Sequence, residues 1–210
     1  MAETNSENHG IKEQKQIEFL LQFSASTTDY CVCIVDIVSS TKIMMSLPHV
    51  KVSRYYEIFL NKMAEIVRKF DGIVVKNIGD SLLFYFPNTA TKQTPEFENV
   101  LNCCFAMLET NPEINQMMSS EDLPPIKYRI SGEYGPVIVA KISTSSTNDI
   151  FGNTVNICSK INRLAEPNSM VIGEGLHKQV QNFSEYAFTK IDDVSGNQEF
   201  AVYSVLKKSV

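Results

Sequence analysis

Two short apolar runs separated by a Gly-Asp step restrict most strongly what this chain can fold into. The runs IVVKN and SLLFYF flank Ile78, Gly79 and Asp80, and both are rich in the β-branched and aromatic residues that are typical of strands. Gly79 can supply the positive φ angle that a short turn needs. The sequence therefore predicts a tight hairpin over residues 73–86.

The rest of the chain alternates between strand and helix patterns. DYCVCIVDI, residues 29–37, is typical of a buried central strand. Residues 126–142 indicate a second hairpin that bends near Tyr134, Gly135 and Pro136. Apolar residues that recur at three and four positions predict helices, and short apolar runs predict the closing strands. The predicted helices are residues 11–23, 52–70, about 97–110, about 152–165 and a short helix after MVIG (170–173); the final strands are 185–191 and 199–206.

This order of elements determines the expected fold. The order β-α-β-β-α-β predicts an α+β fold, a ferredoxin-like sandwich with a mostly antiparallel sheet, helices over one face, and an additional helix and strands at the C-terminus. A length of 210 residues, 43% of them hydrophobic, suits one globular domain. We expect residues 1–26 to form an N-terminal tail with a short helix and residues 27–210 to form the domain.

Composition excludes several classes of function. The net charge of -5 gives no basic field for nucleic acid. The five cysteines contain no CxxC pair, so neither a disulfide framework nor a zinc knuckle is indicated. The polar N-terminus lacks the apolar segment of a signal peptide, and no apolar run reaches the roughly 18 residues of a membrane span. We therefore expect a cytoplasmic protein without a membrane span.

Two carboxylates stand at strand ends that the predicted fold brings to one sheet edge. Asp36 ends the first predicted strand, and Asp80 lies in the turn of the neighbouring hairpin. Two acids suit a hard divalent cation such as Mg²⁺, which commonly takes one or two carboxylates and fills its other positions with water and substrate phosphates. The alternative is that Asp80 only serves the turn and Asp36 only caps a loop, because turns favour Asp on backbone grounds.

A polar turn follows Asp36. Ser39, Ser40 and Thr41 come directly after the strand, and the free backbone N–H groups of such a turn can hold phosphate. The segment is not a Walker loop, because the GxxxxGK[ST] pattern is missing.

A polar stripe runs along the predicted helix in DIFGNTVNICSKINRL. At 100° per residue, Asn156, Lys160 and Arg163 fall on one side, and the apolar residues cover the opposite arc. The stripe therefore faces away from the core. The alternative interpretation is a solvated helix face with Asp149 as its cap.

With these segments the chain resembles the class III nucleotidyl cyclases, the adenylate and guanylate cyclase catalytic domain. The resemblance runs from about Asp29 to Val205 and rests on three motifs in order: VDIVSSTK, VVKNIGDSLLFYF and DIFGNTVNICSKINRL. In the family these segments correspond to a metal-binding Asp with a phosphate-binding turn, to K-x-x-G-D, and to D-x-x-G-x-x-V-N-x-x-x-R. The resemblance thus implies that residues 27–210 are a cyclase catalytic domain.

The resemblance implies roles for the polar residues. Two Mg²⁺ or Mn²⁺ ions per site would be bound by Asp36, Asp80 and the carbonyl of Ile37, and the turn at residues 39–41 would hold phosphate. Asn156 matches the residue that orients the ribose. Lys160 stands where the family usually has an Arg that stabilises the transition state. Arg163 lies on the same stripe and could compensate for this change.

The resemblance also points to the substrate and the assembly. Lys76 and Asp149 occupy the two positions that select the base. A Lys ammonium and an Asp carboxylate match the N1 acceptor and N6 donor of adenine, whereas guanine reverses that pattern. The sequence therefore predicts conversion of ATP to cyclic AMP and pyrophosphate. The family shares its sites between two protomers, so the resemblance implies a homodimer.

Three departures from the family keep a second hypothesis open. Lys160 lacks the bidentate donors of Arg, Asn197 stands where the family often has a phosphate-binding Lys, and Pro136 stands where some members carry an Arg. The alternative function is therefore a weakly active or inactive cyclase-homology domain that acts as an ATP-binding regulatory or dimerisation module.

Overall fold

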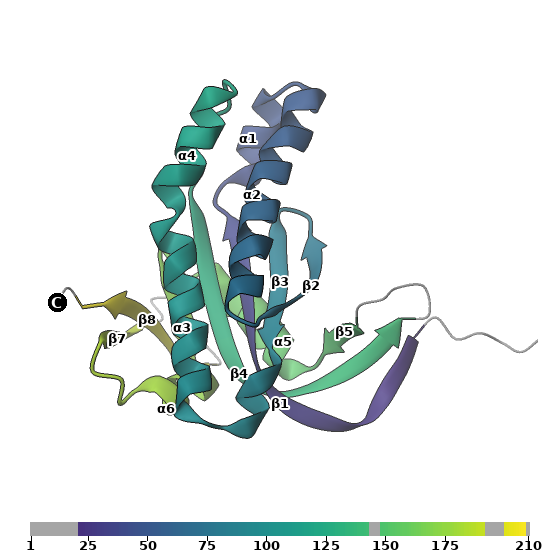
Figure 1. Ribbon diagram of the computed structural model, residues 1–210, viewed down its shortest axis with the longest axis vertical. Coiled ribbons are helices and arrows are strands. Elements are labelled where there is room, and N and C mark those ends of the chain that lie inside the picture. The colour runs from purple at the N-terminus through teal and green to yellow at the C-terminus, as the bar shows by residue number, and fades with distance from the viewer. Residues whose placement is uncertain (1–20, 143–147, 192–199, 209–210) are drawn as a thin grey trace, which may run out of the picture.

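The computed structural model describes residues 21–142, 148–191 and 200–208 (Figure 1). In chain order the elements are β1 (Leu21–Ile37), α1 (Ser40–Ser46), α2 (His49–Lys69), β2 (Ile73–Ile78), β3 (Ser81–Phe86), the 3₁₀ helix η1 (Pro87–Thr91), α3 (Thr94–Glu109), α4 (Asn111–Ser120), β4 (Tyr128–Ile142), β5 (Asn148–Phe151), α5 (Asn153–Asn162), β6 (Met170–Gly173), α6 (Glu174–Val180), β7 (Tyr186–Ile191) and β8 (Val202–Lys207).

One eight-stranded sheet organises these elements. Its order is β2-β3-β1-β4-β6-β8-β7, with β5 on the far part of β4. Strands β4 and β6 pair in parallel, and the other neighbours pair antiparallel. The stretch β2-β3-β1-β4 is the strand order of a ferredoxin-like unit. The predicted α+β fold with a mostly antiparallel sheet is confirmed.

Residues 31–35 of β1 are buried on both faces, as the continuous apolar run predicts. Cys31, Cys33 and Val35 point into a core that is covered by α2, α3 and α6, whereas Val32 and Ile34 point to the opposite face and pack near α5. Figure 1 shows α2 and α3 in front of the sheet and α5 behind it. The expectation that helices cover one face is therefore wrong for α5. Its Cys158 closes the second face instead.

The predicted hairpin is formed by β2 and β3. Ile78 pairs with Ser81, and Gly79 in the turn has a φ of 61°. The turn thus lies where the sequence places it, and it leaves Asp80 directly before the first residue of β3.

The second predicted hairpin is wrong, because residues 128–142 form the single strand β4. This strand pairs with β1 along its length, and Pro136 stands opposite Asp29. On its other side, β4 pairs with β6 up to Gly132 and with β5 from Ile138. Pro136 lies between these two ladders, so its missing N–H interrupts neither of them.

The N-terminal helix prediction is wrong where it can be tested. Residues 21–23 open strand β1 and pair with residues 140–142 of β4, while residues 11–20 lie outside the described part of the chain. Cross-strand pairing overrides the local helical pattern here. Strand β1 therefore begins well before the predicted residue 29.

Two α-helices were not predicted, and neither was the 3₁₀ helix η1. The polar turn after β1 continues into α1, whose Ile43 and Met44 pack against the core. Helix α4 follows α3 after Thr110 and buries Ile114 and Met118. Tertiary packing of a few apolar residues stabilises such short helices more than intrinsic propensity does.

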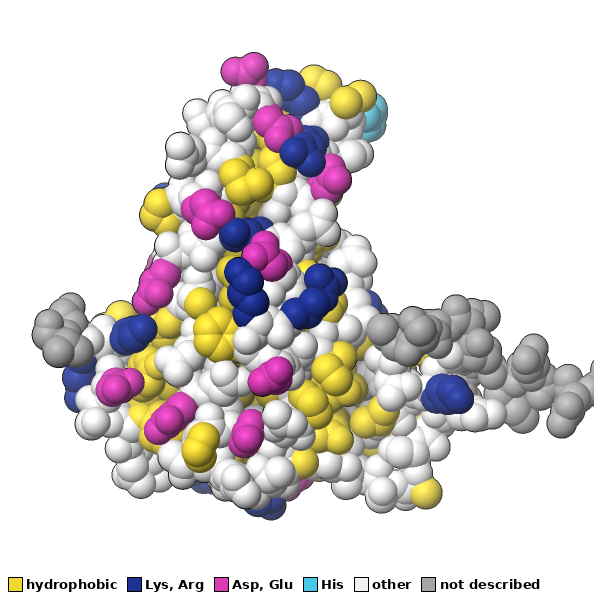
Figure 2. Space-filling view, in the orientation of Figure 1, with side chains coloured by type: hydrophobic (Ala, Val, Ile, Leu, Met, Phe, Trp, Pro, Cys, Tyr) yellow, Lys and Arg dark blue, Asp and Glu magenta, His cyan; other side chains and the backbone are white. Residues whose placement is uncertain are grey.

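The outer faces of α2 and α4 carry both signs of charge. Figure 2 shows basic and acidic side chains interspersed over these helices. Arg54 forms ion pairs with Glu57 and Glu121, and Lys62 pairs with Glu113. Exposed pairs of this kind contribute about 0–1 kcal/mol each, and they leave no field of one sign over this face.

A buried carboxylate ties β4 to the start of α6. The Glu133 side chain is 5% exposed, and its Oε1 accepts the backbone N–H of Tyr134 at 2.8 Å. Burial raises the pKa of Glu133 to about 7, although the backbone N–H groups of Tyr134, Gly175 and Leu176 act in the opposite direction. A Cβ atom on Gly173 or Gly175 would overlap the carboxylate, so glycines shape its cavity.

We predict that Glu133 makes folding stability depend on pH. The pKa of its carboxyl is higher in the folded chain than the ordinary value of 4.5, so its contribution is fully present below about pH 4.5 and is lost as the pH rises through 7. The loss amounts to about 3 kcal/mol at most. Glu133→Gln should flatten this decline in urea unfolding curves between pH 5 and 8. The exposed Glu166→Gln is the control, and equal pH slopes for both variants would contradict the prediction.

Candidate active site

Asp36 lies at the end of β1 between polar residues of both neighbouring strands. It stands opposite Ser81 of β3 and Arg129 of β4. The hydroxyl of Ser81 donates to Oδ1 of Asp36 at 2.6 Å, and Nε and Nη2 of Arg129 donate to Oδ2 at 3.1 and 2.9 Å. The three contacts fix the orientation of the Asp36 carboxylate.

Asp80 lies at the same sheet edge. It directly precedes Ser81, the residue opposite Asp36 in the ladder, so the hairpin turn places both predicted metal-binding acids at one edge of the sheet. Tyr56 of α2 faces this turn. Burial raises the pKa of the Tyr56 phenol, and the negative charge of Asp80 raises it further.

The donor set at this edge fits a hard divalent cation. Asp36 and Asp80 offer carboxylate oxygens, and the backbone carbonyl of Ile37 follows Asp36 directly. A carboxylate has about four lone-pair sites, so the three bonds to Asp36 do not exhaust its capacity. The described residues contain no group of three or more His, Cys, Asp or Glu side chains that could hold a metal. Mg²⁺ held by one or two carboxylates commonly fills its other positions with water and with substrate phosphates.

The predicted phosphate-binding turn becomes the start of α1. Ser39 has a φ of 60°, and its carbonyl accepts the N–H groups of Lys42 and Ile43. Ser40 and Thr41 form the first turn of the helix, where backbone N–H groups have no partner within the helix. The turn follows Asp36 closely in the sequence, so its backbone N–H groups lie near the acidic edge.

Lys76 and Asp149 meet although they lie far apart in the sequence. Nζ of Lys76 on β2 donates to Oδ2 of Asp149 on β5 at 2.5 Å. Asp149 is nearly buried, with 8% of its side chain exposed, whereas Lys76 keeps 43%. The second oxygen, Oδ1, accepts the backbone N–H of Ile150 at 2.8 Å. The pair presents a donor and an acceptor side by side.

Lys76 and Asp149 come from β2 and β5, whereas Asp36 and Asp80 lie at the end of β1 and in the turn before β3. Strand β2 is an outer strand and β5 pairs with the far part of β4, and the two strands still contact each other. Among the described residues, hydrogen bonds join Lys76 to Asp149 and join Asp36 to Ser81 and Arg129, but none links the two sets. Within the described residues, the predicted site residues thus form two hydrogen-bonded groups.

Helix α5 presents the predicted polar stripe on its exposed side. Asn156, Lys160 and Arg163 are exposed, while Cys158 and Ile161 are buried. Nζ of Lys160 lies 5.4 Å from the centre of the Phe200 ring.

The end of α5 is anchored beside β1. The side chain of Asn162 donates to the carbonyl of Ile34 at 3.2 Å and to Ser131 at 3.1 Å. The carbonyl of Arg163 accepts a long contact of 3.5 Å from Arg129. Helix α5 therefore ends close to the cation that holds Asp36.

Comparison with known proteins assigns this arrangement to a family. The family model described as the adenylate and guanylate cyclase catalytic domain matches residues 23–207. The chain belongs to this family.

Relatives and solved structures agree with the cyclase family. A cytidylate cyclase from Staphylococcus aureus is 28% identical over 180 residues, which are 81% of this chain and 43% of the relative. A cytidylate cyclase from Escherichia coli is 25% identical over 79% of this chain and 38% of the relative. The chain thus spans less than half the length of these curated relatives. The crystal structure of the adenylyl cyclase CyaB from P. aeruginosa superposes with a TM-score of 0.75 at 18% identity, covering 90% of this chain and 97% of that one.

Sequence reasoning missed two residues that contact Asp36 in this candidate site, Arg129 and Ser81. No local pattern marks Arg129, because its partner Asp36 follows only from the pairing of β1 with β4. Two of the departures from the family pattern were Asn197 and Pro136. Asn197 lies outside the described residues, and Pro136 lies within β4.

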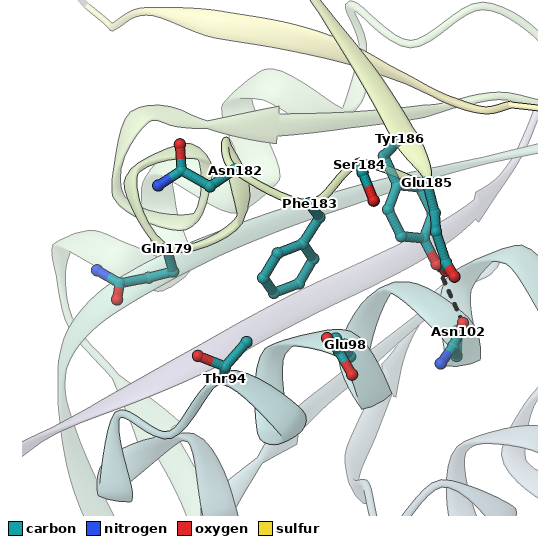
Figure 3. A pocket seen from close by; sticks show the side chains of 9 residues that line it. All are labelled: Thr94, Glu98, Asn102, Gln179, Asn182, Phe183, Ser184, Glu185 and Tyr186. Carbon is teal, nitrogen blue, oxygen red and sulfur yellow. Dashed lines mark hydrogen bonds between the residues drawn. The ribbon is translucent and has the colours of Figure 1, made fainter.

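A cavity of about 430 Å³ lies elsewhere in the cyclase domain, between α3 and the segment from α6 to β7. Figure 3 shows Phe183 pointing toward Thr94 and Glu98, and the phenol of Tyr186 donating to Asn102. None of the predicted site residues lines this cavity.

In the described part of the domain, no helix combines the length and the apolar character needed to cross a membrane.

We predict that Gly152, which precedes α5, tolerates no side chain. Its φ is 136°, and a Cβ atom would lie 3.2 Å from the carbonyl oxygen of Pro136. Gly152→Ala should lower the free energy of unfolding by about 1–3 kcal/mol, measured by urea denaturation. Gly79→Ala is the matched control, because a Cβ there meets nothing within 4 Å. An equal or smaller loss at Gly152 would contradict the role of this close approach.

Proposed function

We propose that this domain is a nucleotidyl cyclase for a nucleoside triphosphate whose base carries an amino group beside a ring-nitrogen acceptor. The 3′-hydroxyl attacks the α-phosphorus and pyrophosphate leaves, which gives a cyclic nucleotide. The Lys76–Asp149 pair carries this proposal, because it holds a donor and an acceptor next to each other at 2.5 Å. ATP is the substrate that the sequence predicts.

Hydrogen bonding explains why other bases are rejected. Lys76 donates to the ring nitrogen of the base, and Asp149 accepts from the amino group. Guanine and uracil place an N–H and a carbonyl at these positions, so a donor faces Lys76 or an acceptor faces Asp149. A buried group left unpaired costs about 1–3 kcal/mol, and more when it is charged.

CTP is the second candidate substrate. Cytosine offers the same pattern as adenine, an acceptor at N3 beside the amino group at N4, so the Lys76–Asp149 pair suits both bases. The two relatives named as cytidylate cyclases favour CTP. Adenine and cytosine differ in ring size, but the Lys76–Asp149 pair alone does not distinguish bases by size.

The acidic edge supplies the groups for the triphosphate. Asp36, Asp80 and the carbonyl of Ile37 would hold Mg²⁺ or Mn²⁺, two ions per site. Bound ions of this kind lower the pKa of the 3′-hydroxyl and neutralise charge on the phosphates. The guanidinium of Arg129 and the N–H groups of residues 39–41 then bind and orient phosphate oxygens.

The exposed stripe of α5 completes the site. Asn156 orients the ribose, Lys160 binds the charge that develops on the α-phosphate, and Arg163 adds a second cation to it. No hydrogen bond between described residues joins the acidic edge to the base-binding pair, and the family shares its sites between two protomers. We therefore propose a homodimer in which each site combines the acids of one protomer with Lys76, Asp149 and the stripe of its partner.

We predict that the purified protein with Mn²⁺ converts ATP or CTP to a cyclic nucleotide and pyrophosphate, with GTP and UTP at least about 10-fold slower. Chromatography of all four reactions measures this. Asp80→Asn should abolish turnover because it removes a metal-binding carboxylate, whereas the exposed turn variant Asp71→Asn should not. Binding of ATP or CTP without any product would favour the regulatory module instead.

We predict that Arg163→Ala lowers kcat by about 10- to 100-fold and changes KM little, because the lost charge acts mainly in the transition state. Steady-state kinetics with the preferred nucleotide measure both constants. Arg68→Ala, at the exposed end of α2, is the control. An unchanged kcat would remove Arg163 from the proposed mechanism.

A further inference from the structure

An aromatic ring lies against the base-binding lysine. Phe151 follows Asp149 by two residues on β5, and Nζ of Lys76 lies 5.6 Å from the centre of its ring. An ammonium within about 6 Å of a ring centre is attracted by the ring quadrupole. Lys76 is therefore held by two neighbours, the carboxylate of Asp149 and the ring of Phe151.

A second ring holds the first in place. Phe23, at the start of β1, packs edge-on against Phe151 with the ring centres 5.3 Å apart. Phe23 stands opposite Ala140 of β4, and Ala140 stands opposite Asp149 of β5. Phe23 nevertheless keeps 56% of its surface exposed, so it contributes little to the core.

Base selection requires a fixed ammonium. Lys76 carries four rotatable bonds and keeps 43% of its side chain exposed. Its contact with Asp149 alone therefore does not fix the direction from which the ammonium approaches a base. A ring below the ammonium restricts that freedom, and less rotamer entropy is then lost when a base binds. The two partners together define one position for the donor.

We propose that Phe151 is a specificity-determining positioning residue of the base site. Its ring, backed by Phe23, keeps the ammonium of Lys76 beside Asp149, so that the donor and the acceptor face one edge of the base. This inference rests on the proposed function for its effect on base choice. The contact between Phe151 and Lys76 can be tested without any turnover.

The first experiment measures acylation of Lys76 by a small active ester, quantified by mass spectrometry against the exposed Lys178. Phe151→Ala and Phe151→Leu should raise the rate at Lys76 about 2- to 5-fold. Phe151→Tyr should leave it unchanged. Leucine keeps apolar bulk against Phe23 but has no ring, so a purely structural role would make the Leu variant behave like wild type. That result would overturn the inference.

The second experiment measures kcat/KM for the preferred amino base and for GTP. Phe151→Leu should lower the ratio of kcat/KM for the preferred nucleotide to kcat/KM for GTP about 3- to 10-fold. Phe151→Tyr should keep this ratio at the wild-type value. Phe200→Ala is the matched control, because the ring of Phe200 lies against Lys160 in the same way. This variant should change kcat/KM by the same factor for every nucleotide. An unchanged ratio in Phe151→Leu would overturn the inference. If wild type turns over no nucleotide, the proposed function fails, and the acylation rates still decide whether Phe151 positions Lys76.

Discussion

The burial of residues 31–35 of β1 on both faces is the constraint on which the rest of the structure depends. Its odd-numbered residues from Cys31 to Val35 pack against α2 and α3, and Val32 and Ile34 pack toward α5. A strand without a free face has one permissible register with its neighbours. That register sets Asp36 between Ser81 and Arg129, so hydrophobic packing determines the geometry of a polar site.

The two halves of the site differ in how they are held. The acidic edge depends on the regular ladders of β1 with β3 and β4 and on the turn at Gly79. The base-binding pair depends on an outer strand and a short one, β2 and β5, and on aromatic contacts near the ends of the sheet. Regular pairing at the half proposed to bind phosphate, and short outer strands at the half proposed to bind the base, suit a family whose members are named for different nucleotides.

The sequence was sufficient where local and global signals agreed. The hairpin at Gly79, the buried run before Asp36 and the exposed stripe of α5 follow from turn chemistry and periodicity. It was insufficient where pairing between distant segments decided the outcome. The strand that includes Pro136 looked like a hairpin because the gap between its two outer partners cannot be read locally, and Arg129 escaped notice because its acid is 93 residues away. The positions of the site residues relative to a nucleotide remain predictions.

The irregular pairing between Phe23 and Thr27 has a consequence for how such domains can diverge. Beyond Thr27 the ladder runs without interruption to Ile37, so an inserted or deleted residue there would exchange the two faces of β1 and carry Asp36 away from its neighbours. Within the irregular stretch, the same change alters only the N-terminal extension. The bulge thus separates a part of the strand that can vary in length from a part that cannot.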